Sequence, residues 1–396
     1  MRPIKIWSEC LKNNKRKLRG ELPMNKKYKA AVIGVGFIGA GSHVPAYQTD
    51  ERCELVAVAD LKPGAAEYVA KRYGVEKFYE DPQQMLEECK PDVVSICVPN
   101  QYHKEWSIAA LEAGANVLCE KPICVTLADA KEIYAAAESA GRIFMPVQND
   151  RMGARTVLRD MIKDGALGDV YFGECENIRR RGIPNWGSFH IKKDNFGGPF
   201  CDVGVHFIDS ILYMLGNPKF KSISGNTWSK IAPYETDRPN LGTVSKSKNF
   251  VPRPYSSSEF TVEDHSAGTL RLGEDILINF KFAWALNSPP FDGIRLNGTK
   301  GGLVFNKYAE NPFILYSSKG ETMTDTILNL NVHHKFEHIQ NPGIYLIVEH
   351  FLDVLDGKAE PIVTKEEALN VVTIIQAFYR SAELKREVTA EEIEGM

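Results

Sequence analysis

The sequence has few cysteines, and the cysteines it has are not spaced in pairs. Eight of them are spread over 396 residues, and several lie inside apolar, strand-like runs. A buried free thiol behaves as a small hydrophobic side chain, so this pattern favours a reducing compartment over a disulfide-bonded scaffold. We therefore expect a cytoplasmic protein without a cysteine-based zinc site.

Long apolar runs and an excess of one charge are also missing. No stretch approaches the roughly 20 apolar residues of a membrane span, and the net charge is −3. We therefore expect neither a membrane nor a nucleic acid as partner, because no basic field would attract one. A hydrophobic content of 43% and a charged content of 25% are ordinary for a globular protein with room for two or three domains.

The first 27 residues form a basic extension. They are rich in lysine and arginine and have no continuous apolar segment, so they do not resemble a secretory signal. Met24 stands just before the first apolar strand. We expect residues 1–27 to be poorly ordered, and a basic interaction arm is the alternative.

A glycine pattern typical of dinucleotide-binding folds follows the first strand. Residues 29–33 are apolar and predict a strand. Gly34, Gly36 and Gly39 come next as G-x-G-x-x-G. In such folds these glycines permit a tight turn, a close approach to a pyrophosphate and close packing of the next helix. Alone, the pattern is equally compatible with a flexible glycine turn.

An acidic residue at the end of the second strand strengthens this interpretation. The run CELVAVAD predicts a strand that ends at Asp60, twenty-one positions after Gly39 (60 − 39). There a carboxylate would bond the ribose hydroxyls of NAD and repel the extra phosphate of NADP. Lys62 lies close by and could favour that phosphate. The sequence therefore favours NAD and leaves NADP open.

Strand-like and helix-like segments alternate up to about residue 150. This alternation predicts an α/β Rossmann fold, a doubly wound parallel sheet. Helices are expected at 63–73, 82–89, 103–114 and 126–140, and strands at 75–79, 92–100 and 116–122. Ligands of such sheets bind at the carboxyl ends of the strands. Those ends carry Pro99, Asn100, Glu120 and Lys121.

The second half has a different pattern. Alternating segments after residue 259 predict a mostly antiparallel sheet, and the polar segment 228–258 is expected to be a long loop. Trp186 and Phe189 lie in a glycine-rich loop, where they could stack on a sugar ring or pack on each other.

Two histidine patterns suggest different chemistry. His333, His334 and His338 include a pair with helical ligand spacing, but no carboxylate or cysteine set completes a metal site, and we predict none. Asp202 and His206 are four apart in a predicted helix, 202–215, and so share one face. Asp209 lies one turn further and could orient them.

Together these motifs resemble the Gfo/Idh/MocA oxidoreductase family, which includes glucose–fructose oxidoreductase and inositol dehydrogenases. The motifs are the glycine pattern, Asp60, the tripeptide EKP at 120–122, the run PVQNDRM and the stretch GGPFCDVGVHFID. The resemblance covers the chain from about residue 28 onward.

The resemblance implies the domain organisation. Residues 28–150 would form an NAD(P)-binding Rossmann domain. Residues 151–396 would form an α+β substrate-binding and oligomerisation domain with a large open, mostly antiparallel sheet. Its C-terminal helices would pack back toward the first domain. Because the open sheet face makes subunit contacts in the family, a homo-oligomer is expected, whether a dimer, a tetramer or a hexamer.

The resemblance also implies the site. In the family, the lysine of the tripeptide and the aspartate and histidine of D-x-G-x-H line the substrate pocket beside the nicotinamide, and here these are Lys121, Asp202 and His206. The predicted cofactor-binding residues are Gly34, Gly36, Phe37, Ile38, Gly39, Asp60, Pro99, Asn100, His103, Glu120, Lys121 and Gln148. The predicted substrate-binding residues are Lys121, Arg151, Arg179, Trp186, Asp202 and His206, with His190 and Asp292 as further polar candidates.

The expected activity is NAD(P)-dependent hydride transfer from a secondary hydroxyl of a sugar, glycoside or polyol. We expect His206 to take the hydroxyl proton, Lys121 to stabilise the developing alkoxide, and Asp202 to orient the substrate or the lysine. The stretch RRRGIP-WG-F resembles members that act on glucosides, which implies the third ring hydroxyl. Two alternatives remain: an NAD-dependent glycosidase that works by transient oxidation and elimination, and a non-catalytic sugar or nucleotide sensor.

Overall fold

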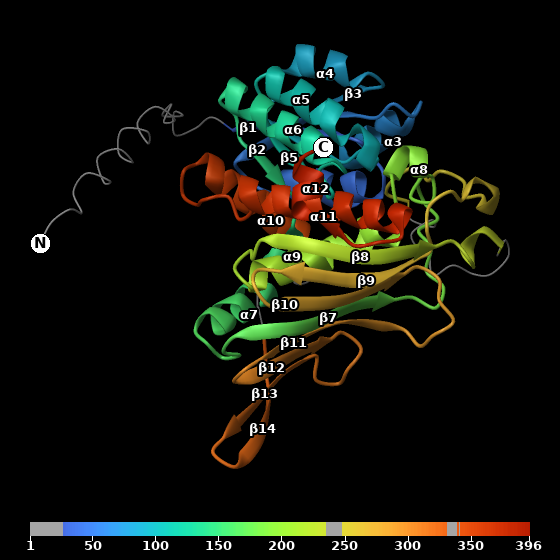
Figure 1. Ribbon diagram of the computed structural model, residues 1–396. Coiled ribbons are helices and arrows are strands. Elements are labelled where there is room, and N and C mark those ends of the chain that lie inside the picture. The colour runs from blue at the N-terminus through green and yellow to red at the C-terminus, as the bar shows by residue number, and fades with distance from the viewer. Residues whose placement is uncertain (1–26, 235–247, 331–338, 340) are drawn as a thin grey trace, which may run out of the picture.

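The computed structural model describes residues 27–234, 248–330, 339 and 341–396 as two sheets with helices packed on them (Figure 1). Except for Lys27, the predicted N-terminal extension lies outside the described residues. So do the three histidines of the metal alternative and residues 235–247 of the predicted long loop.

The first domain is built on a six-stranded parallel sheet, which confirms the predicted doubly wound fold. The strand order is β3-β2-β1-β4-β5-β6, so the order reverses between β1 and β4 and leaves a crevice at their carboxyl ends. The strands are β1 (Tyr28–Ile33), β2 (Cys53–Ala59), β3 (Lys77–Tyr79), β4 (Val93–Ile96), β5 (Asn116–Cys119) and β6 (Phe144–Pro146).

Helices on both faces of this sheet begin close to where the sequence places them. The side chain of Asp81 accepts the backbone N–H of Gln83 at the start of α4, and Thr126 caps α6 by accepting the N–H of Asp129. The segment after the glycine pattern begins with a π-helical turn, η1, before α2. The helical elements are η1 (Gly39–His43), α2 (Val44–Thr49), α3 (Ala65–Tyr73), α4 (Pro82–Cys89), η2 (Asn100–Tyr102), α5 (His103–Glu112) and α6 (Leu127–Ala140).

The second domain contains a nine-stranded sheet that is antiparallel except for the parallel pair β7 and β10. This confirms the predicted large, mostly antiparallel sheet. Its order is β14-β13-β12-β11-β7-β10-β9-β8-β15. The strands are β7 (Val170–Ile178), β8 (Phe220–Trp228), β9 (His265–Leu272), β10 (Ile276–Ala283), β11 (Phe291–Gly298), β12 (Gly301–Asn306), β13 (Phe313–Lys319), β14 (Thr322–Ile327) and β15 (Val388–Thr389).

Helices pack on one face of this sheet and also reach the first domain. Phe378 of α11 stacks on Phe200 at 3.8 Å between ring centroids and meets Phe280 of β10 edge-on. The helical elements are η3 (Asn149–Arg151), α7 (Ala154–Lys163), α8 (Lys192–Asn195), η4 (Phe200–Gly204), α9 (Val205–Met214), η5 (Ala232–Tyr234), η7 (Ser257–Glu259), α10 (Pro342–Leu355), α11 (Lys365–Leu384) and α12 (Ala390–Glu394).

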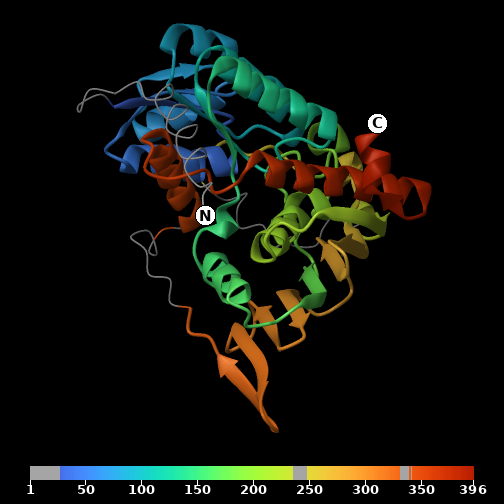
Figure 2. The ribbon, with the colours of Figure 1, turned by 60° about the vertical axis from the view of Figure 1, so that its left-hand side comes forward.

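Helix α10 packs on the first domain. Ile347 and Phe351 share a hydrophobic cluster with Val32 of β1, and Arg52 Nη1 donates to Asp353 Oδ1 at 2.6 Å. Figure 2 shows α10 beside the blue part of the chain and α11 continuing toward the second sheet. The two domains are therefore joined by the C-terminal helices as well as by the chain after β6.

Two features of the described ranges concern location. The seven cysteines within them are free and buried. In the same ranges, no helix is both long and apolar enough to cross a membrane.

Candidate functional site

A cavity of about 670 Å³ lies where the two domains meet. From the first domain it is lined by the glycine-rich turn after β1, Asp60 after β2, Pro99 and Asn100 after β4, and Glu120 and Lys121 after β5. From the second domain it is lined by Trp186, Asn195, Asp202 and His206. The carboxyl ends of four parallel strands and residues far along the chain therefore form one site.

The glycine-rich turn fits a dinucleotide. A Cβ at Gly39 would overlap the carbonyl oxygen of Gly34, so only glycine lets the helix start this close to β1. A Cβ at Gly36 would meet nothing within 4 Å, which leaves the backbone open to a phosphate. Phe37 and Ile38 also line the cavity, as the sequence predicts for cofactor-binding residues.

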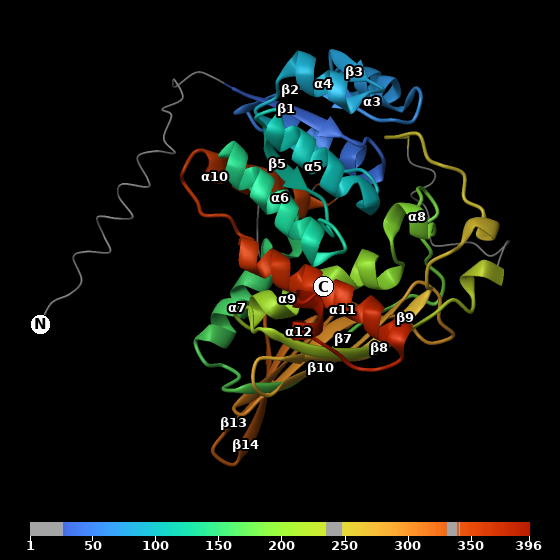
Figure 3. The same cartoon turned by 45° about the horizontal axis from the view of Figure 1, so that its top comes forward.

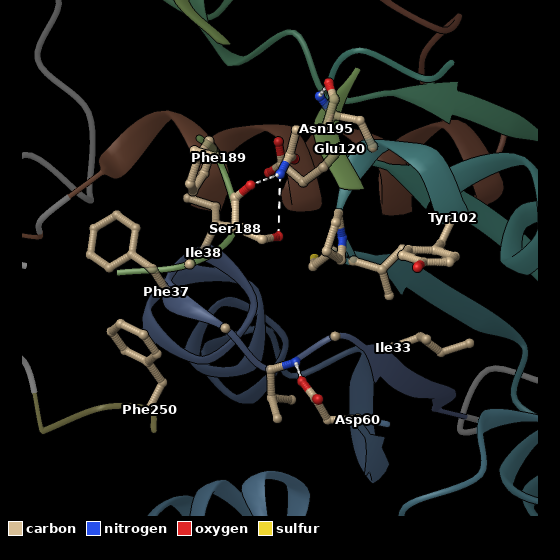
Figure 4. Close-up of a pocket in the computed structure, with 18 of the residues that line it drawn as sticks. Ile33, Phe37, Ile38, Asp60, Tyr102, Glu120, Ser188, Phe189, Asn195 and Phe250 are labelled. Carbon is tan, nitrogen blue, oxygen red and sulfur yellow. Dashed lines mark hydrogen bonds between the residues drawn. The ribbon is translucent and has the colours of Figure 1, made fainter. Parts of the chain in front are cut away.

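Asp60 is held against this turn. Its Oδ2 accepts the backbone N–H of Val35 at 2.9 Å, the dashed line at Asp60 in Figure 4. Its Oδ1 accepts the backbone N–H of Lys62, also at 2.9 Å. Burial raises its pKa, and the two backbone hydrogen bonds oppose that shift. Each carboxylate oxygen keeps a lone pair for a ribose hydroxyl, so the side chain can still serve as the sequence predicts.

A segment of the second domain, which we call the strap (residues 248–253), runs over the first domain at this end of the cavity. Lys62 Nζ donates to the carbonyl oxygens of Val251 and Pro252 at 3.1 and 3.2 Å. Tyr68 of α3 donates its hydroxyl to the carbonyl oxygen of Lys248 at 2.7 Å. In Figure 3 the strap is the yellow segment that runs down from beside α3.

An aromatic group anchors the strap. Phe250 is buried and lies edge-on to Phe37 of the glycine-rich turn, with 6.1 Å between ring centroids (Figure 4). Trp186 also packs on Phe37, with 5.5 Å between ring centroids, and on Phe189 at 5.8 Å. These rings cover the turn that would hold the pyrophosphate.

Glu120 is fastened by a histidine that the sequence reasoning missed. Since an ionised carboxylate only accepts, the Nε2–H of His43 donates to Glu120 Oε1 at 3.0 Å, while Nδ1 lies 2.9 Å from the Ser95 hydroxyl. Burial alone raises the pKa of Glu120, but His43 and Lys121 outweigh it and leave the pKa below its ordinary value. Glu120 is therefore a buried anion beside the cavity.

Lys121 and Asp202 meet across the domain boundary. Lys121 Nζ donates to the backbone oxygen of Asp202 at 2.7 Å and lies 3.4 Å from its Oδ1. The other carboxylate oxygen, Oδ2, accepts the indole N–H of Trp284 at 3.0 Å. Burial raises the pKa of Asp202, but the positive charge of Lys121 and other neighbours lowers it overall, so the group is ionised.

His206 lies beyond this pair at the start of α9. Gly204 precedes it, and a Cβ there would lie 2.8 Å from the ring of Phe282, so the glycine of D-x-G-x-H allows this close packing. Burial and then Lys121 lower the pKa of His206, against the opposing charges of Asp150, Asp202 and Glu120. The imidazole is therefore neutral near pH 7, as a proton acceptor must be.

The predicted roles of Arg151, in the short helix η3, and of Asp209, in α9, are wrong. Arg151 does not line the cavity: it is fully buried, and its guanidinium donates to both carboxylate oxygens of Asp209, at 2.9 and 2.7 Å. Its Nη1 also donates to Glu367 Oε2 at 2.8 Å. Asp209 consequently holds Arg151 and does not orient Asp202 or His206. The buried ion pair joins η3, α9 and α11.

Other predicted polar residues also lie apart from the cavity. Arg179 donates to the carbonyl oxygen of Gly182 and reaches Asp202 only through its charge. Asp292 on β11 lies 3.5 Å from Lys307. His190 is buried against Tyr255, and burial followed by the charge of Arg253 lowers its pKa to about 4.

Of the remaining predicted cofactor-binding residues, some line the cavity and one does not. Asn100 lines the cavity, and its amide donates to the carbonyl oxygen of Asn195 on α8. His103 lines it too, but its ring nitrogens face the carbonyl oxygens of Pro122 and Val98, so it joins two loops. Gln148 is buried outside the lining of the large cavity.

Several residues that shape the site had no local signal. Trp284 and the strap come from distant segments, and His43 follows the glycine pattern without a recognisable spacing. Asp150 lies inside the run PVQNDRM, but no role was predicted for it. Among the described residues, no group of three or more histidine, cysteine, aspartate or glutamate side chains could hold a metal ion.

Two family models match the chain. One, described as the oxidoreductase family with NAD-binding Rossmann fold, matches residues 28–148. The other, described as the oxidoreductase family with C-terminal alpha/beta domain, matches residues 159–390. Together they span both domains.

Individual proteins are similar over nearly the whole length. D-glucoside 3-dehydrogenase of Escherichia coli (strain K12) is 31% identical over 360 residues, which cover 90% of this chain and 95% of that protein. An oxidoreductase domain protein from Kribbella flavida has a TM-score of 0.75 at 22% identity, with 92% of this chain and 99% of that chain covered. Levoglucosan dehydrogenase, solved with NADH and L-sorbose, has a TM-score of 0.74 at 21% identity, with 93% and 100% covered. These two structures support the fold.

Proposed function

The chain belongs to the Gfo/Idh/MocA family of NAD-binding oxidoreductases, and we propose that it oxidises a secondary hydroxyl of a sugar, glycoside or polyol. The third ring hydroxyl of a D-glucoside is the first position to test, since the 31% identical relative is named for that reaction. One observation carries the proposal: Lys121, Asp202 and His206 line the same cavity as the glycine-rich turn.

The three side chains divide the work of removing a hydroxyl proton. Bound NAD supplies the acceptor for the hydride. His206, neutral because burial lowers its pKa, takes the proton of the hydroxyl. Lys121 places a positive charge beside the oxygen as negative charge develops there. Asp202 holds Lys121 in position through both its backbone oxygen and its carboxylate.

We further propose that the protein prefers NAD to NADP. Asp60 offers carboxylate oxygens where the ribose of the adenosine half would lie, and a phosphate there would be repelled. Lys62, the residue that could attract such a phosphate, already donates to two carbonyl oxygens of the strap. Its ammonium group therefore holds the strap against the first domain.

We also propose that the protein is a homo-oligomer in the cytoplasm. Residues on the face of the nine-stranded sheet away from α9 and α11 carry ion pairs between Glu174 and Arg295 and between Glu176 and Lys281. These side chains are partly exposed, so the face lies at the surface and is available to a second copy. Light scattering should give a multiple of 44.3 kDa, and a monomer mass at micromolar concentration would rule the oligomer out. Free, buried cysteines suit a reducing compartment.

The test of the reaction is NADH absorbance with purified protein and NAD. D-glucosides, their 3-deoxy counterparts, free hexoses and inositols form the panel, and the variant His206→Ala is the control. We expect absorbance to grow with the glucoside and not with its 3-deoxy form, and to be lost in the variant. Release of an aglycone without net NADH would instead identify the redox-neutral glycosidase. If no compound gave either NADH or a released aglycone, the proposed function would be refuted.

A further inference from the structure

The imidazole of His206 has one carboxylate facing its Nδ1. Asp150 Oδ2, from the short helix η3, lies 3.6 Å from that nitrogen, and Nδ1 has no hydrogen-bond partner of its own. The gap is slightly longer than a hydrogen bond, and such contacts in unliganded sites commonly tighten when substrate binds. Asp150 lies inside the run PVQNDRM, but the sequence alone predicts no role for it.

The other carboxylate near His206 is already engaged. Asp202 accepts the indole N–H of Trp284 on one oxygen and lies against Lys121 with the other. Its contacts fix the lysine. Asp150 is thus the group placed to act on the imidazole, although Asp202 is the one four residues from His206 in the sequence.

Asp150 also differs from the other groups in its access to solvent. Its side chain is 43% exposed, against 23% for His206. The other ionisable groups that face His206 are Lys121, Asp202 and Glu120, with side chains 15%, 17% and 10% exposed. A proton that reaches His206 therefore has its most open route outward through Asp150.

We propose that Asp150 is a positioning and proton-relay residue for His206, an inference that rests on the proposed oxidation of a hydroxyl. Before reaction, the Nδ1–H of His206 points to Asp150, so the lone pair on Nε2 faces the hydroxyl. When Nε2 takes the hydroxyl proton, Nδ1 gives its own proton to Asp150, which passes it to water. One proton is taken from the hydroxyl and one is released to water, which leaves a neutral imidazole with its proton on Nε2. After the product leaves, Nε2 gives this proton to water and Nδ1 regains one through Asp150, so the starting tautomer is restored for the next turnover.

The variant Asp150→Asn removes the negative charge and keeps the size. Because the charge of Asp150 raises the pKa of His206, we expect that pKa to fall in the variant. The acid limb of kcat/KM should move to lower pH, since the imidazole stays neutral there. The plateau of kcat should fall on the order of 10²-fold with KM nearly unchanged. Asp150→Glu, or added formate, should restore part of kcat.

NMR titration of the imidazole, with the His206 signal identified by its absence in His206→Gln, reads the pKa without any substrate. Asp325→Asn, which removes a carboxylate from the exposed strand β14, is the matched control and should leave both the titration and kcat unchanged. Unaltered titration of His206 and unaltered kcat in Asp150→Asn would overturn the inference. If no compound yields NADH even with the native protein, the proposed function fails, while the titration still decides whether Asp150 acts on His206.

Discussion

Replacing Arg151 by methionine tests whether this arginine supports the fold or touches the substrate. The sequence predicts a substrate contact, whereas the structure buries the guanidinium between Asp209 and Glu367. Methionine keeps the length of the side chain and removes its charge and its donors. It also leaves the carboxylate of Asp209 buried without its partner.

The expected loss is large. Removing one member of a buried ion pair typically costs about 3–5 kcal/mol, because the other charge is left uncompensated. The free energy of unfolding of a typical domain is only about 5–15 kcal/mol, so the variant should unfold at a clearly lower urea concentration. The double variant Arg151→Met with Asp209→Asn should recover part of the loss.

The loss should depend on pH with a defined sign. Burial raises the pKa of Asp209, and Arg151 counteracts that shift, so the pKa rises further in the variant. An acid whose folded pKa is raised destabilises the protein as pH climbs above its unfolded value, about 3.9. The deficit of the variant relative to the native protein should therefore be greatest near pH 7 and shrink as pH falls toward 4.

Urea unfolding followed by circular dichroism measures this deficit, and NADH formation gives KM. Arg180→Met, the same change at an exposed arginine, is the control and should alter stability little. A variant as stable as the native protein but with a KM raised severalfold would refute the structural assignment and restore Arg151 as a substrate residue.

Three further predictions concern the cavity. Lys121→Met should lower kcat about 10²–10³-fold while calorimetry shows NAD binding retained, and loss of NAD binding would contradict the assigned role. Asp60→Ser should weaken NAD binding about ten- to a hundredfold, the worth of hydrogen bonds to a charged group, and narrow the difference from NADP; unchanged affinity for both cofactors would contradict it. Phe250→Ala should speed NAD dissociation in stopped flow because it removes the anchor of the strap, whereas Val251→Ala should not. Equal dissociation rates in these two variants would show that the strap does not hold the cofactor.

Local patterns were sufficient for most of the first domain. Strand, glycine turn and helix follow one another within a few residues, so periodicity and the terminal Asp60 identify them. The boundaries shifted by about two residues where helix ends depend on caps and packing, as at α3, which begins at Ala65. In the second domain the mostly antiparallel sheet was predictable, but the parallel pairing of β7 with β10 brings together segments about a hundred residues apart and has no local signature.

Some features of the site were likewise predictable from the sequence, and others were not. The residues proposed to react, Lys121, Asp202 and His206, could be picked out from short motifs because each motif forms one turn at the end of a strand or the start of a helix. The directions of adjacent side chains were not identified, since Asp150 and Arg151 sit in one short helix, η3, and face opposite surroundings.

The sequence by itself therefore determined the nucleotide fold and a site for NAD, and it pointed to Lys121, Asp202 and His206 as the residues of the proposed reaction. Only the tertiary structure decided that Arg151 turns inward, that Trp284 and Asp202 position the lysine, and that the strap closes over Lys62. The physical reason is distance along the chain. Arg151 finds its partners 58 and 216 residues away, and such contacts depend on how two separately formed domains pack, which no local pattern records.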